Sequence, residues 1–308
     1  MRGVIREAAP AKLNLALHVR RRRPDGYHDL ETLFAFARDG DTVTVEEWDL
    51  PCFIVTGPFA DALSSPLPLA AGVGGGPSAG AQAAPPPPPP ASGRGEDNLV
   101  TRAEAAFRTA FGIERPHALA LDKHLPVASG IGGGSADAAA TLRALARLHG
   151  IGPHEPRLHT IAASLGADVP ACLLGRAAFG SGRGDDLEPI EGLGDCPALL
   201  VNPGVAVPTG PVFAGWDGVD RGPIAPGATL DCARSGRNDL QPPAEAIAPV
   251  IADAVALLAA QPGVLLARMS GSGATCFALF ADLPARDAAE AAVAARHPGW
   301  WRLATSVA

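Results

Sequence analysis

The sequence predicts a chain of mixed helix and strand, in the α/β or α+β class. Alternating apolar residues at 4–19 and 30–36 are typical of strands. A glycine-rich segment, 126–136, runs directly into a segment with the apolar spacing of a helix. Helix-like and strand-like segments then alternate as far as an alanine-rich helix predicted at 285–296. This alternation indicates a mixed class rather than an all-helical or all-strand one.

The composition indicates a soluble globular protein of one large or two modest domains. Of its 308 residues, 47% are hydrophobic and 19% are charged. The net charge of −7 argues against general nucleic-acid binding. The N-terminal segment has no apolar signal core and the chain has no long apolar run, so we expect no membrane segment. Five scattered cysteines without a Cys-x-x-Cys motif predict neither a disulfide framework nor a zinc site, and they favour a reducing cytoplasm.

The first fifty residues predict a small sheet. Lys12 and Asn14 lie two apart in the first strand and therefore on the same face. On spacing alone, a lysine here is slightly favoured as an edge-strand charge that discourages aggregation. The basic run 20–23 is interpreted as a solvated hairpin end rather than a polyanion site. A Pro-Asp-Gly turn then precedes Tyr27 and His28. Two further strands are predicted after them, at 30–36 and 41–47.

Residues 64–95 interrupt this pattern. They contain three consecutive glycines and six consecutive prolines, with hardly any charged or large apolar side chain. Such a segment cannot offset its ordering entropy by burial, so we expect a disordered or polyproline-like insertion. A ligand for a proline-recognition domain is the alternative, and a tolerated loop expansion is favoured over it.

Periodic segments return after residue 97. A helix is predicted at 99–111, ended by Gly112, and a strand at 117–121. The helix that follows the glycine segment has a stop at Gly150 and an N-cap at Ser135 or Asp137. Its predicted buried stripe is Leu142, Leu145 and Leu148.

Asp168 follows the next predicted helix, 158–165, and precedes a Val-Pro pair. Taken alone, this position favours an N-cap of a short helix over a catalytic role. Three later segments complete the prediction. They are a strand at 198–207, a helix at 244–260, and a second glycine turn that leads into a buried strand within 268–280.

The glycine segment is a candidate phosphate site. Glycines let the backbone approach a ligand closely, and the following helix directs unpaired N–H groups and its positive end toward the loop. A flexible surface turn is an equally good interpretation of the loop alone. The segment is not a Walker loop, because no Gly-Lys-Ser/Thr follows. Ser135 also stands where a dinucleotide fingerprint has its third glycine.

Taken together, these motifs resemble the superfamily of galactokinase, homoserine, mevalonate and phosphomevalonate kinases. Within that superfamily they are most similar to the 4-diphosphocytidyl-2-C-methyl-D-erythritol kinase family. The similarity covers nearly the whole chain outside 64–95. The strings that carry it are Pro10-Ala-Lys-Leu-Asn-Leu15, Pro24-Asp-Gly-Tyr-His28, Glu31-Thr-Leu-Phe34, Glu96-Asp-Asn-Leu99, Gly132-Gly-Gly-Ser135, Leu165-Gly-Ala-Asp-Val-Pro170, Asn202-Pro-Gly-Val205 and Ser270-Gly-Ser-Gly-Ala274.

The resemblance implies an α+β kinase of two lobes. Residues 1–180 would form an ATP-binding lobe like domain 2 of ribosomal protein S5, and residues 181–308 a ferredoxin-like lobe. The enzyme would use ATP and Mg²⁺ to phosphorylate the 2-hydroxyl of 4-diphosphocytidyl-2-C-methyl-D-erythritol, in non-mevalonate isoprenoid biosynthesis. We expect a cytoplasmic monomer or homodimer with no nucleic-acid or membrane partner.

The resemblance also assigns site residues. The catalytic pair falls on Lys12 and Asp168, since a carboxylate must accept the proton of a poorly nucleophilic hydroxyl. Substrate contacts fall on Asn14, Tyr27, His28 and Phe213. Nucleotide contacts fall on Asn98, Lys123 and the loop residues Pro126, Val127, Ala128, Ser129, Gly130, Ile131, Gly132, Gly133, Gly134, Ser135 and Ala136.

Two departures from the pattern concern this loop. Gly133 and Gly134 stand where the wider superfamily has serines, one of which binds Mg²⁺, so the Mg²⁺ ligands stay unknown. Residues 128–131, Ala-Ser-Gly-Ile, replace a more glycine-rich opening.

Three rival functions remain open from the sequence. Another kinase of the superfamily, acting on homoserine or mevalonate, is disfavoured by Tyr27-His28. A non-catalytic nucleotide-binding relative is disfavoured by the presence of both Lys12 and Asp168. A Rossmann oxidoreductase is disfavoured by the missing third glycine.

Overall fold

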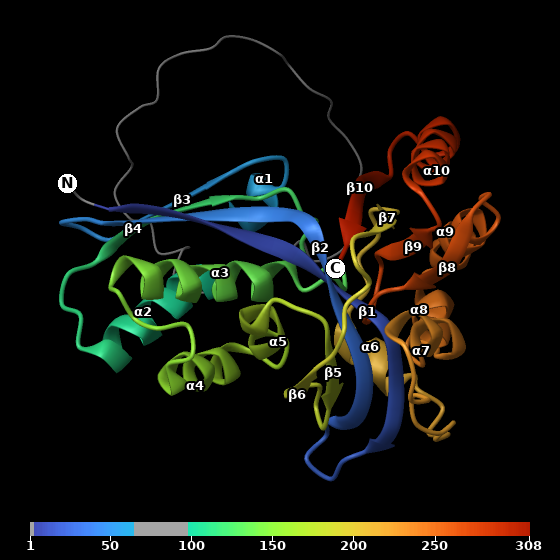
Figure 1. Cartoon of the computed structure of the whole chain (residues 1–308), viewed down its shortest axis with the longest axis horizontal. Coiled ribbons are helices and arrows are strands. Elements are labelled where there is room, and N and C mark those ends of the chain that lie inside the picture. Colours follow the sequence, from blue (N-terminus) through green and yellow to red (C-terminus); the bar gives the residue numbers. More distant parts are fainter. Residues whose placement is uncertain (1–2, 65–97) are drawn as a thin grey trace.

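The computed structural model describes residues 3–64 and 98–308, which form two lobes (Figure 1). The predicted insertion, 64–95, lies almost entirely outside the described residues and stays a prediction. The first lobe contains β1 (Val4–Arg22), β2 (His28–Glu47), β3 (Cys52–Thr56), α1 (Ala60–Ser64), α2 (Leu99–Phe111), β4 (His117–Asp122), α3 (Gly133–Leu148), α4 (Pro156–Leu165) and α5 (Val169–Leu174). A hairpin of β5 (Ala178–Ser181) and β6 (Asp186–Pro189) follows.

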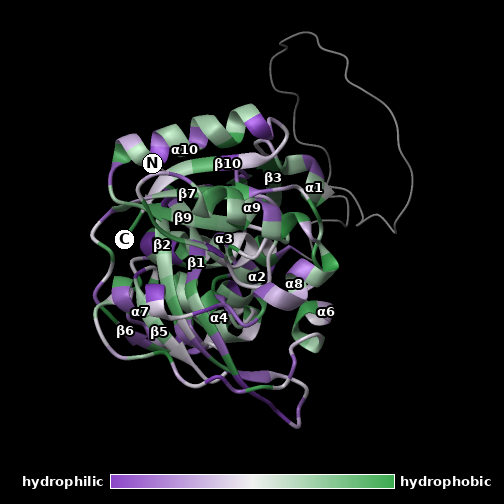
Figure 2. Ribbon diagram, turned by 90° about the vertical axis from the view of Figure 1, so that its right-hand side faces the viewer, coloured by the Kyte–Doolittle hydropathy of each residue, from purple (hydrophilic) through white to green (hydrophobic). Residues whose placement is uncertain are grey.

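The second lobe contains the rest of the chain. Its elements are β7 (Cys196–Asn202), α6 (Thr209–Ala214), α7 (Thr229–Ser235), α8 (Gln241–Ile247), α9 (Val250–Ala259), β8 (Val264–Met269), β9 (Cys276–Phe280), α10 (Leu283–Arg296) and β10 (Trp301–Val307). In Figure 2, α10 alternates between hydrophobic and hydrophilic residues, as expected of a helix that buries one face. The predicted division after residue 180 falls within β5 and stays a prediction.

One continuous sheet joins the two lobes. Its strand order is β3-β4-β2-β10-β7-β9-β8, with β1 and β5 also paired to β2 and β6 paired to β5. β3 and β4 are parallel, and the other pairs are antiparallel. β2 is a single strand where the sequence predicted two, at 30–36 and 41–47. The predicted break between these two strands was wrong, because pairing with β1 continues through Gly40, which lies opposite Pro10.

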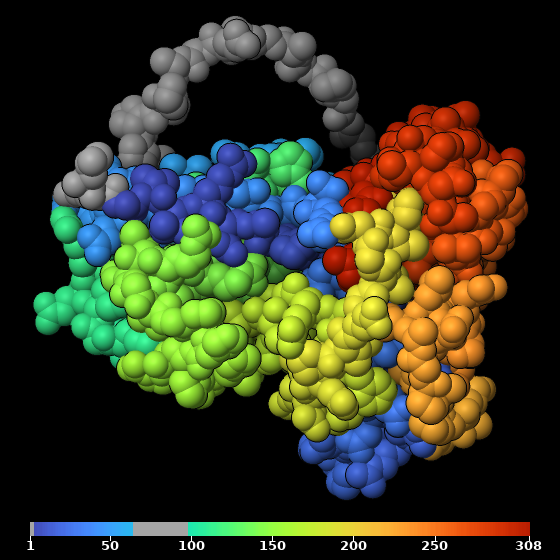
Figure 3. All heavy atoms as spheres, in the orientation of Figure 1, coloured from blue at the N-terminus to red at the C-terminus, as the bar shows by residue number. Residues whose placement is uncertain are grey.

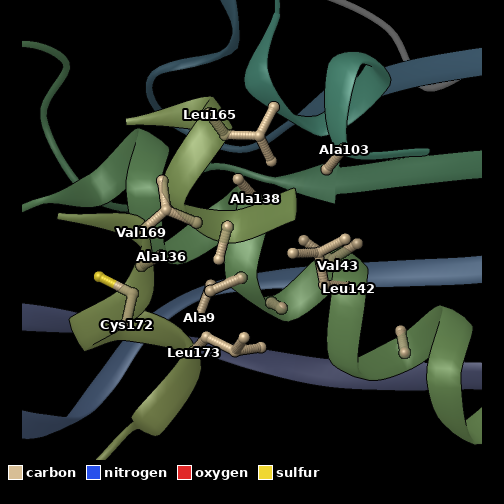
Figure 4. Packing of buried hydrophobic residues seen from close by; sticks show 14 of the residues in the cluster. Ala9, Val43, Ala103, Ala136, Ala138, Leu142, Leu165, Val169, Cys172 and Leu173 are labelled. Carbon is tan, nitrogen blue, oxygen red and sulfur yellow. The ribbon is translucent and has the colours of Figure 1, made fainter. Parts of the chain in front are cut away.

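Helix α3 lies at the centre of the first lobe. Its small side chains, including Ala138, Ala139 and Ala140, are fully buried and allow a close approach to β1 and β2. Figure 4 shows Ala138 and Leu142 among apolar side chains from neighbouring elements. The predicted stripe is present, since Leu142 and Leu145 are fully buried and Leu148 packs at the edge of the cluster.

Helices α8 and α9 replace the single helix predicted at 244–260. The chain leaves the helical conformation at Ala248, with φ −135° and ψ 86°. The residue before a proline is disfavoured in the helical region, and Pro249 follows directly. The apolar spacing was therefore sound, but this local steric effect divides the segment. α9 still buries Ile251, Ala254 and Leu258 against the sheet.

A third apolar cluster belongs to both lobes. Leu13 and Leu15 from β1 are fully buried in it, together with Ala35 from β2. Phe277 and Leu279 from β9 lie in the same cluster. The long β1–β2 hairpin therefore contributes its side chains to both halves of the molecule.

The end of that hairpin projects from the body of the protein (Figure 3). The basic run 20–23 lies here, and three of its arginines form ion pairs, consistent with a solvated hairpin end. The pairs are Arg20 with Glu31 and Asp220, Arg21 with Asp29, and Arg23 with Asp25 and Asp29. Within the described ranges, no helix has both the length and the apolar character needed to span a membrane.

Candidate active site

A cavity of about 820 Å³ lies where the two lobes meet, and residues from both lobes line it. Its walls come from the β1–β2 hairpin, the glycine segment, the α4–α5 connection, the β5–β6 turn, α6 and the second glycine turn. Most of the site residues predicted from the sequence lie in these walls. They are Lys12, Asn14, Tyr27, His28, Ala128, Ser129, Gly130, Gly132, Gly133, Gly134, Ser135, Asp168 and Phe213.

Lys12 and Asp168 meet in this cavity. The Lys12 Nζ lies 3.1 Å from Asp168 Oδ2 and donates a second hydrogen bond to Asn14 Oδ1 at 2.9 Å. The Asn14 side-chain amide in turn donates to the Thr32 hydroxyl at 2.8 Å. Lys12 is only 2% exposed, so the interpretation as a solvated edge-strand charge was wrong, because such a lysine must reach water. A buried ammonium requires partners, and these two residues supply them.

Asp168 occupies the N-cap position of α5 without acting as a cap. Its side chain makes no capping hydrogen bond and extends to Lys12 instead. About 44% of the side chain is exposed, so the carboxylate is accessible from the cavity. The position was therefore predicted correctly, but the carboxylate is available for chemistry rather than used by the helix.

Helix α3 begins directly at the glycine segment. Gly132, with φ 64°, is its N-cap, and no side chain caps the helix. The predicted caps, Ser135 and Asp137, were wrong because α3 starts earlier and both residues lie within its first turns. Gly133, Gly134 and Ser135 line the cavity, so the uncapped first turn of α3 faces it. An uncapped helix start of this kind attracts anions.

The glycine segment is held in place by both lobes. From β1, the Lys12 N–H donates to Ile131 O, with 2.9 Å between the two atoms. From the second glycine turn, the Ser270 hydroxyl donates to Gly130 O at 3.0 Å. Thr275 N also donates to Ser129 O at 3.0 Å. The loop is therefore a fixed structure rather than a flexible turn.

The far end of the cavity is aromatic. The His28 ring lies 5.1 Å from the Phe213 ring and 5.8 Å from the Trp216 ring, measured between centroids. Burial, followed by the positive charge of Arg22, lowers the pKa of His28, which favours a neutral imidazole. Tyr27 is 55% exposed, so it is not a core residue beneath the turn.

Comparison with known proteins identifies the family. Residues 98–176 match the GHMP kinases N terminal domain, and residues 225–299 match the GHMP kinases C terminal domain. The chain is 54% identical to the 4-diphosphocytidyl-2-C-methyl-D-erythritol kinase of Rhizorhabdus wittichii, over 96% of this chain and 92% of that protein. It is 47% identical to the enzyme of the same name from Sphingopyxis alaskensis, over 99% of both.

The chain belongs to the 4-diphosphocytidyl-2-C-methyl-D-erythritol kinase family.

Solved structures agree with this family membership. A 4-(cytidine 5'-diphospho)-2C-methyl-D-erythritol kinase superposes with a TM-score of 0.73 and 32% identity, covering 100% of this chain and 99% of that one. The homoserine kinase of Cytophaga hutchinsonii shares the fold, with a TM-score of 0.66 at 17% identity, covering 99% of this chain and 96% of that one. These findings confirm the predicted two-lobed α+β kinase fold and exclude the Rossmann alternative.

Asn98 and Lys123, which the family resemblance assigned to the nucleotide, do not line the cavity. Asn98 caps α2, with its side-chain oxygen accepting from Val100 N at 2.9 Å. Lys123 is buried beneath Gly133 and donates to Asp41 Oδ2 and, at 2.7 Å, to Asp137 Oδ2. Burial and the nearby Asp41 raise the pKa of Asp137, although Lys123 opposes the shift. Lys123 therefore supports the loop from below rather than facing the cavity.

Four predicted loop residues also lie outside the cavity lining: Pro126, Ile131 and Ala136 are buried, and Val127 is exposed. Sequence reasoning, conversely, missed several residues that do line it. Among them, Arg183 and Gly184 come from the β5–β6 turn. Thr209 of α6 and Ser272 of the second glycine turn also line it, and their hydroxyl groups lie 3.0 Å apart within the second lobe. The Gly-Arg-Gly string at 182–184 was the available signal for the first pair.

Proposed function

We propose that this chain transfers the γ-phosphoryl group of ATP to the 2-hydroxyl of 4-diphosphocytidyl-2-C-methyl-D-erythritol. The observation that carries the proposal is the arrangement within one cavity. The Lys12–Asp168 pair lies there together with the uncapped start of α3 and an aromatic end that suits a base. The family membership supports the same substrate, because the relatives are named for it.

Asp168 acts as the general base in the proposed mechanism. An alkyl hydroxyl is a poor nucleophile, so a carboxylate within hydrogen-bond reach accepts its proton as the phosphoryl group is transferred. The half-exposed carboxylate of Asp168 can reach a substrate in the cavity. Lys12, held by Asn14 and Asp168, stabilises the negative charge that develops there.

The nucleotide is bound by backbone groups in this proposal. The N–H groups at the start of α3 and the positive end of its dipole receive the phosphates of ATP. The loop needs no rearrangement, because Ser129, Gly130 and Ile131 are already fixed by backbone and hydroxyl contacts.

The donors available for Mg²⁺ are few. Within residues 3–64 and 98–308, no group of three or more His, Cys, Asp or Glu side chains is arranged to hold a metal. Mg²⁺ in kinases is usually bound by one or two carboxylates together with substrate phosphates and water. Asp168 is used as the base in this proposal, so the Ser135 hydroxyl, which also lines the cavity, is the protein donor that fits such a role. Bound Mg²⁺ would neutralise the charge of the triphosphate.

The aromatic end recognises cytosine in this proposal. Tyr27 and Phe213 offer ring faces, and the neutral His28 imidazole can both donate and accept a hydrogen bond. We further propose that the enzyme acts in the cytoplasm, since the reaction requires no nucleic acid or membrane. We also propose that it is a monomer or homodimer.

The proposed function is tested by ADP release. We expect the purified protein to release ADP with 4-diphosphocytidyl-2-C-methyl-D-erythritol and Mg²⁺-ATP, but not with homoserine or mevalonate. A coupled assay with pyruvate kinase and lactate dehydrogenase measures the rate for each substrate. Turnover of homoserine or mevalonate in preference to the cytidyl substrate would disprove the assignment.

The cytosine site gives a separate prediction for Tyr27. Stacking a base on an aromatic ring is worth about 1–3 kcal/mol, so Tyr27→Ala should raise KM for the cytidyl substrate by about 5- to 150-fold. The KM for ATP and the melting temperature should change little, because Tyr27 is 55% exposed. Steady-state kinetics and a thermal melt test both expectations. A variant that melts several degrees lower yet keeps its substrate KM would show that Tyr27 is structural.

A further inference from the structure

The proposed function assigns no residue to the negative diphosphate of the substrate. The substrate class is a nucleoside diphosphate ester, in which two negative phosphates separate the base from the alcohol. Tyr27, His28 and Phe213 suit the base, and Lys12 with Asp168 suits the alcohol. The inference below rests on this proposed function and concerns the diphosphate between those ends.

The strand register identifies what lies at that middle position. Along β2, His28 marks the aromatic end, and Thr32 marks the alcohol end through its hydrogen bond with Asn14. The two residues lie about 13 Å apart at 3.3 Å per residue. Leu30 stands midway between them, and its N–H donates to Gly182 O at 2.7 Å. The β5–β6 turn is therefore attached to β2 at the middle of the cavity.

Arg183 is the cation on that turn. Among the described residues that line the cavity, the cationic side chains are Lys12, Arg22 and Arg183. Lys12 donates to Asn14 and Asp168 at the alcohol end. Arg22 lies at the aromatic end, where it donates to His28 Nε2 at 3.4 Å and to Ala214 O at 3.4 Å. Arg183 belongs to the turn that is attached to β2 between the two ends, and its guanidinium lies beside Tyr27, on the aromatic side of that middle position.

The guanidinium of Arg183 is partly engaged and partly available. Asp185 accepts from its Nε and Nη2, which occupies one edge of the group. The other edge keeps donors for a ligand, in the planar arrangement that suits phosphate oxygens. The Arg183 Cζ also lies 5.4 Å from the centroid of the Tyr27 ring, so the cation sits beside the proposed base site. The side chain is 38% exposed, so a ligand can reach it.

We propose that Arg183 binds the diphosphate of the substrate and makes binding depend on the phosphate groups. Asp185 orients the guanidinium, and the turn between β5 and β6 presents it to the cavity. A competing explanation is that Arg183 merely supports the Tyr27 ring. The two explanations differ in which ligands they affect.

The test compares CDP, CMP and cytidine as competitive inhibitors of the wild type and of Arg183→Gln, at saturating ATP. A charge-assisted hydrogen bond is worth about 1.5–3 kcal/mol, so the inhibition constant for CDP should rise by roughly 10- to 150-fold. The constant for cytidine should change by less than about threefold, with CMP between the two. The same loss should appear in KM for the cytidyl substrate rather than in kcat, and Arg183→Lys should recover part of it.

Two controls make the result specific. Arg38 pairs with Asp195 as Arg183 pairs with Asp185, but it does not line the cavity, so Arg38→Gln should leave all three constants unchanged. Asp185→Asn removes the orienting partner but keeps the cation, so it should retain most of the preference for CDP over cytidine.

The outcomes separate this proposal from the proposed function. Equal weakening of cytidine and CDP by Arg183→Gln would show that Arg183 only supports Tyr27 and would overturn the proposal. Unchanged inhibition by CDP would do the same. Wild-type protein that neither turns over the cytidyl substrate nor is inhibited by CDP would overturn the proposed function, and this proposal with it.

Discussion

Replacing Asp168 with asparagine is expected to lower kcat by roughly 10²- to 10⁴-fold, the usual contribution of a general base. Asparagine keeps the shape of the side chain but cannot accept the proton of the hydroxyl. The fold should survive, because the Asp168 side chain makes no capping hydrogen bond and Lys12 keeps Asn14 as a partner. Steady-state kinetics and a thermal melt of the purified variant measure both effects.

Asp195→Asn is the matched control for this prediction. Asp195 is 54% exposed and forms an ion pair with Arg38, but it does not line the cavity. Its replacement should leave kcat unchanged. If Asp168→Asn retains near-normal kcat while its KM values rise, Asp168 positions substrate and another group accepts the proton.

Replacing Gly130 with alanine is expected to lower the free energy of unfolding, on the order of 2–5 kcal/mol, and to raise KM for ATP. A Cβ at this position would lie 2.5 Å from Ser270 O and 2.7 Å from Gly273 O, both backbone atoms of the second glycine turn. Its φ of +77° adds strain for any residue with a side chain. Because the clash separates the two glycine turns, the loop that faces ATP should shift. Urea denaturation and kinetics with varied ATP measure the two effects.

Gly204→Ala separates the two causes. Gly204 has the same φ of +77°, but no heavy atom counted among the described residues lies within 4 Å of its Cβ position. In this variant the free energy of unfolding should fall only by the cost of a left-handed backbone conformation, about 1–2 kcal/mol, and the KM for ATP should stay unchanged. Equal losses in the two variants would mean that the contact with Ser270 and Gly273 is unimportant.

Local patterns in the sequence were enough to predict many elements. The helix predicted at 99–111 coincides with α2, and its stop, Gly112, has a left-handed φ of 65°. Predictions were wrong where a neighbour in sequence or in space decided the conformation. Pro249 divides the predicted helix 244–260, and pairing with β1 merges two predicted strands into β2. Apolar spacing carries no information about either effect.

The candidate site shows the same division. Motif resemblance led to Lys12, Asp168 and the glycine segment, which the fold brings to one cavity. The surroundings of Lys123 could not be predicted, because Asp41 is 82 positions away in the sequence. Arg183 was missed for a similar reason, since its place in the cavity depends on the pairing of β5 with β2. Short sequence patterns do not predict contacts between residues that are far apart in the sequence.

The apolar cluster shared by the lobes has a consequence for cooperativity. Leu13 and Leu15 belong to the first lobe, but they lie in one buried cluster with Phe277 and Leu279 of the second. A fragment that ended near residue 190 would expose these leucines to water and lose several large buried contacts. We therefore expect that neither half folds on its own, and that a substitution in the core of one lobe also lowers the stability of the other.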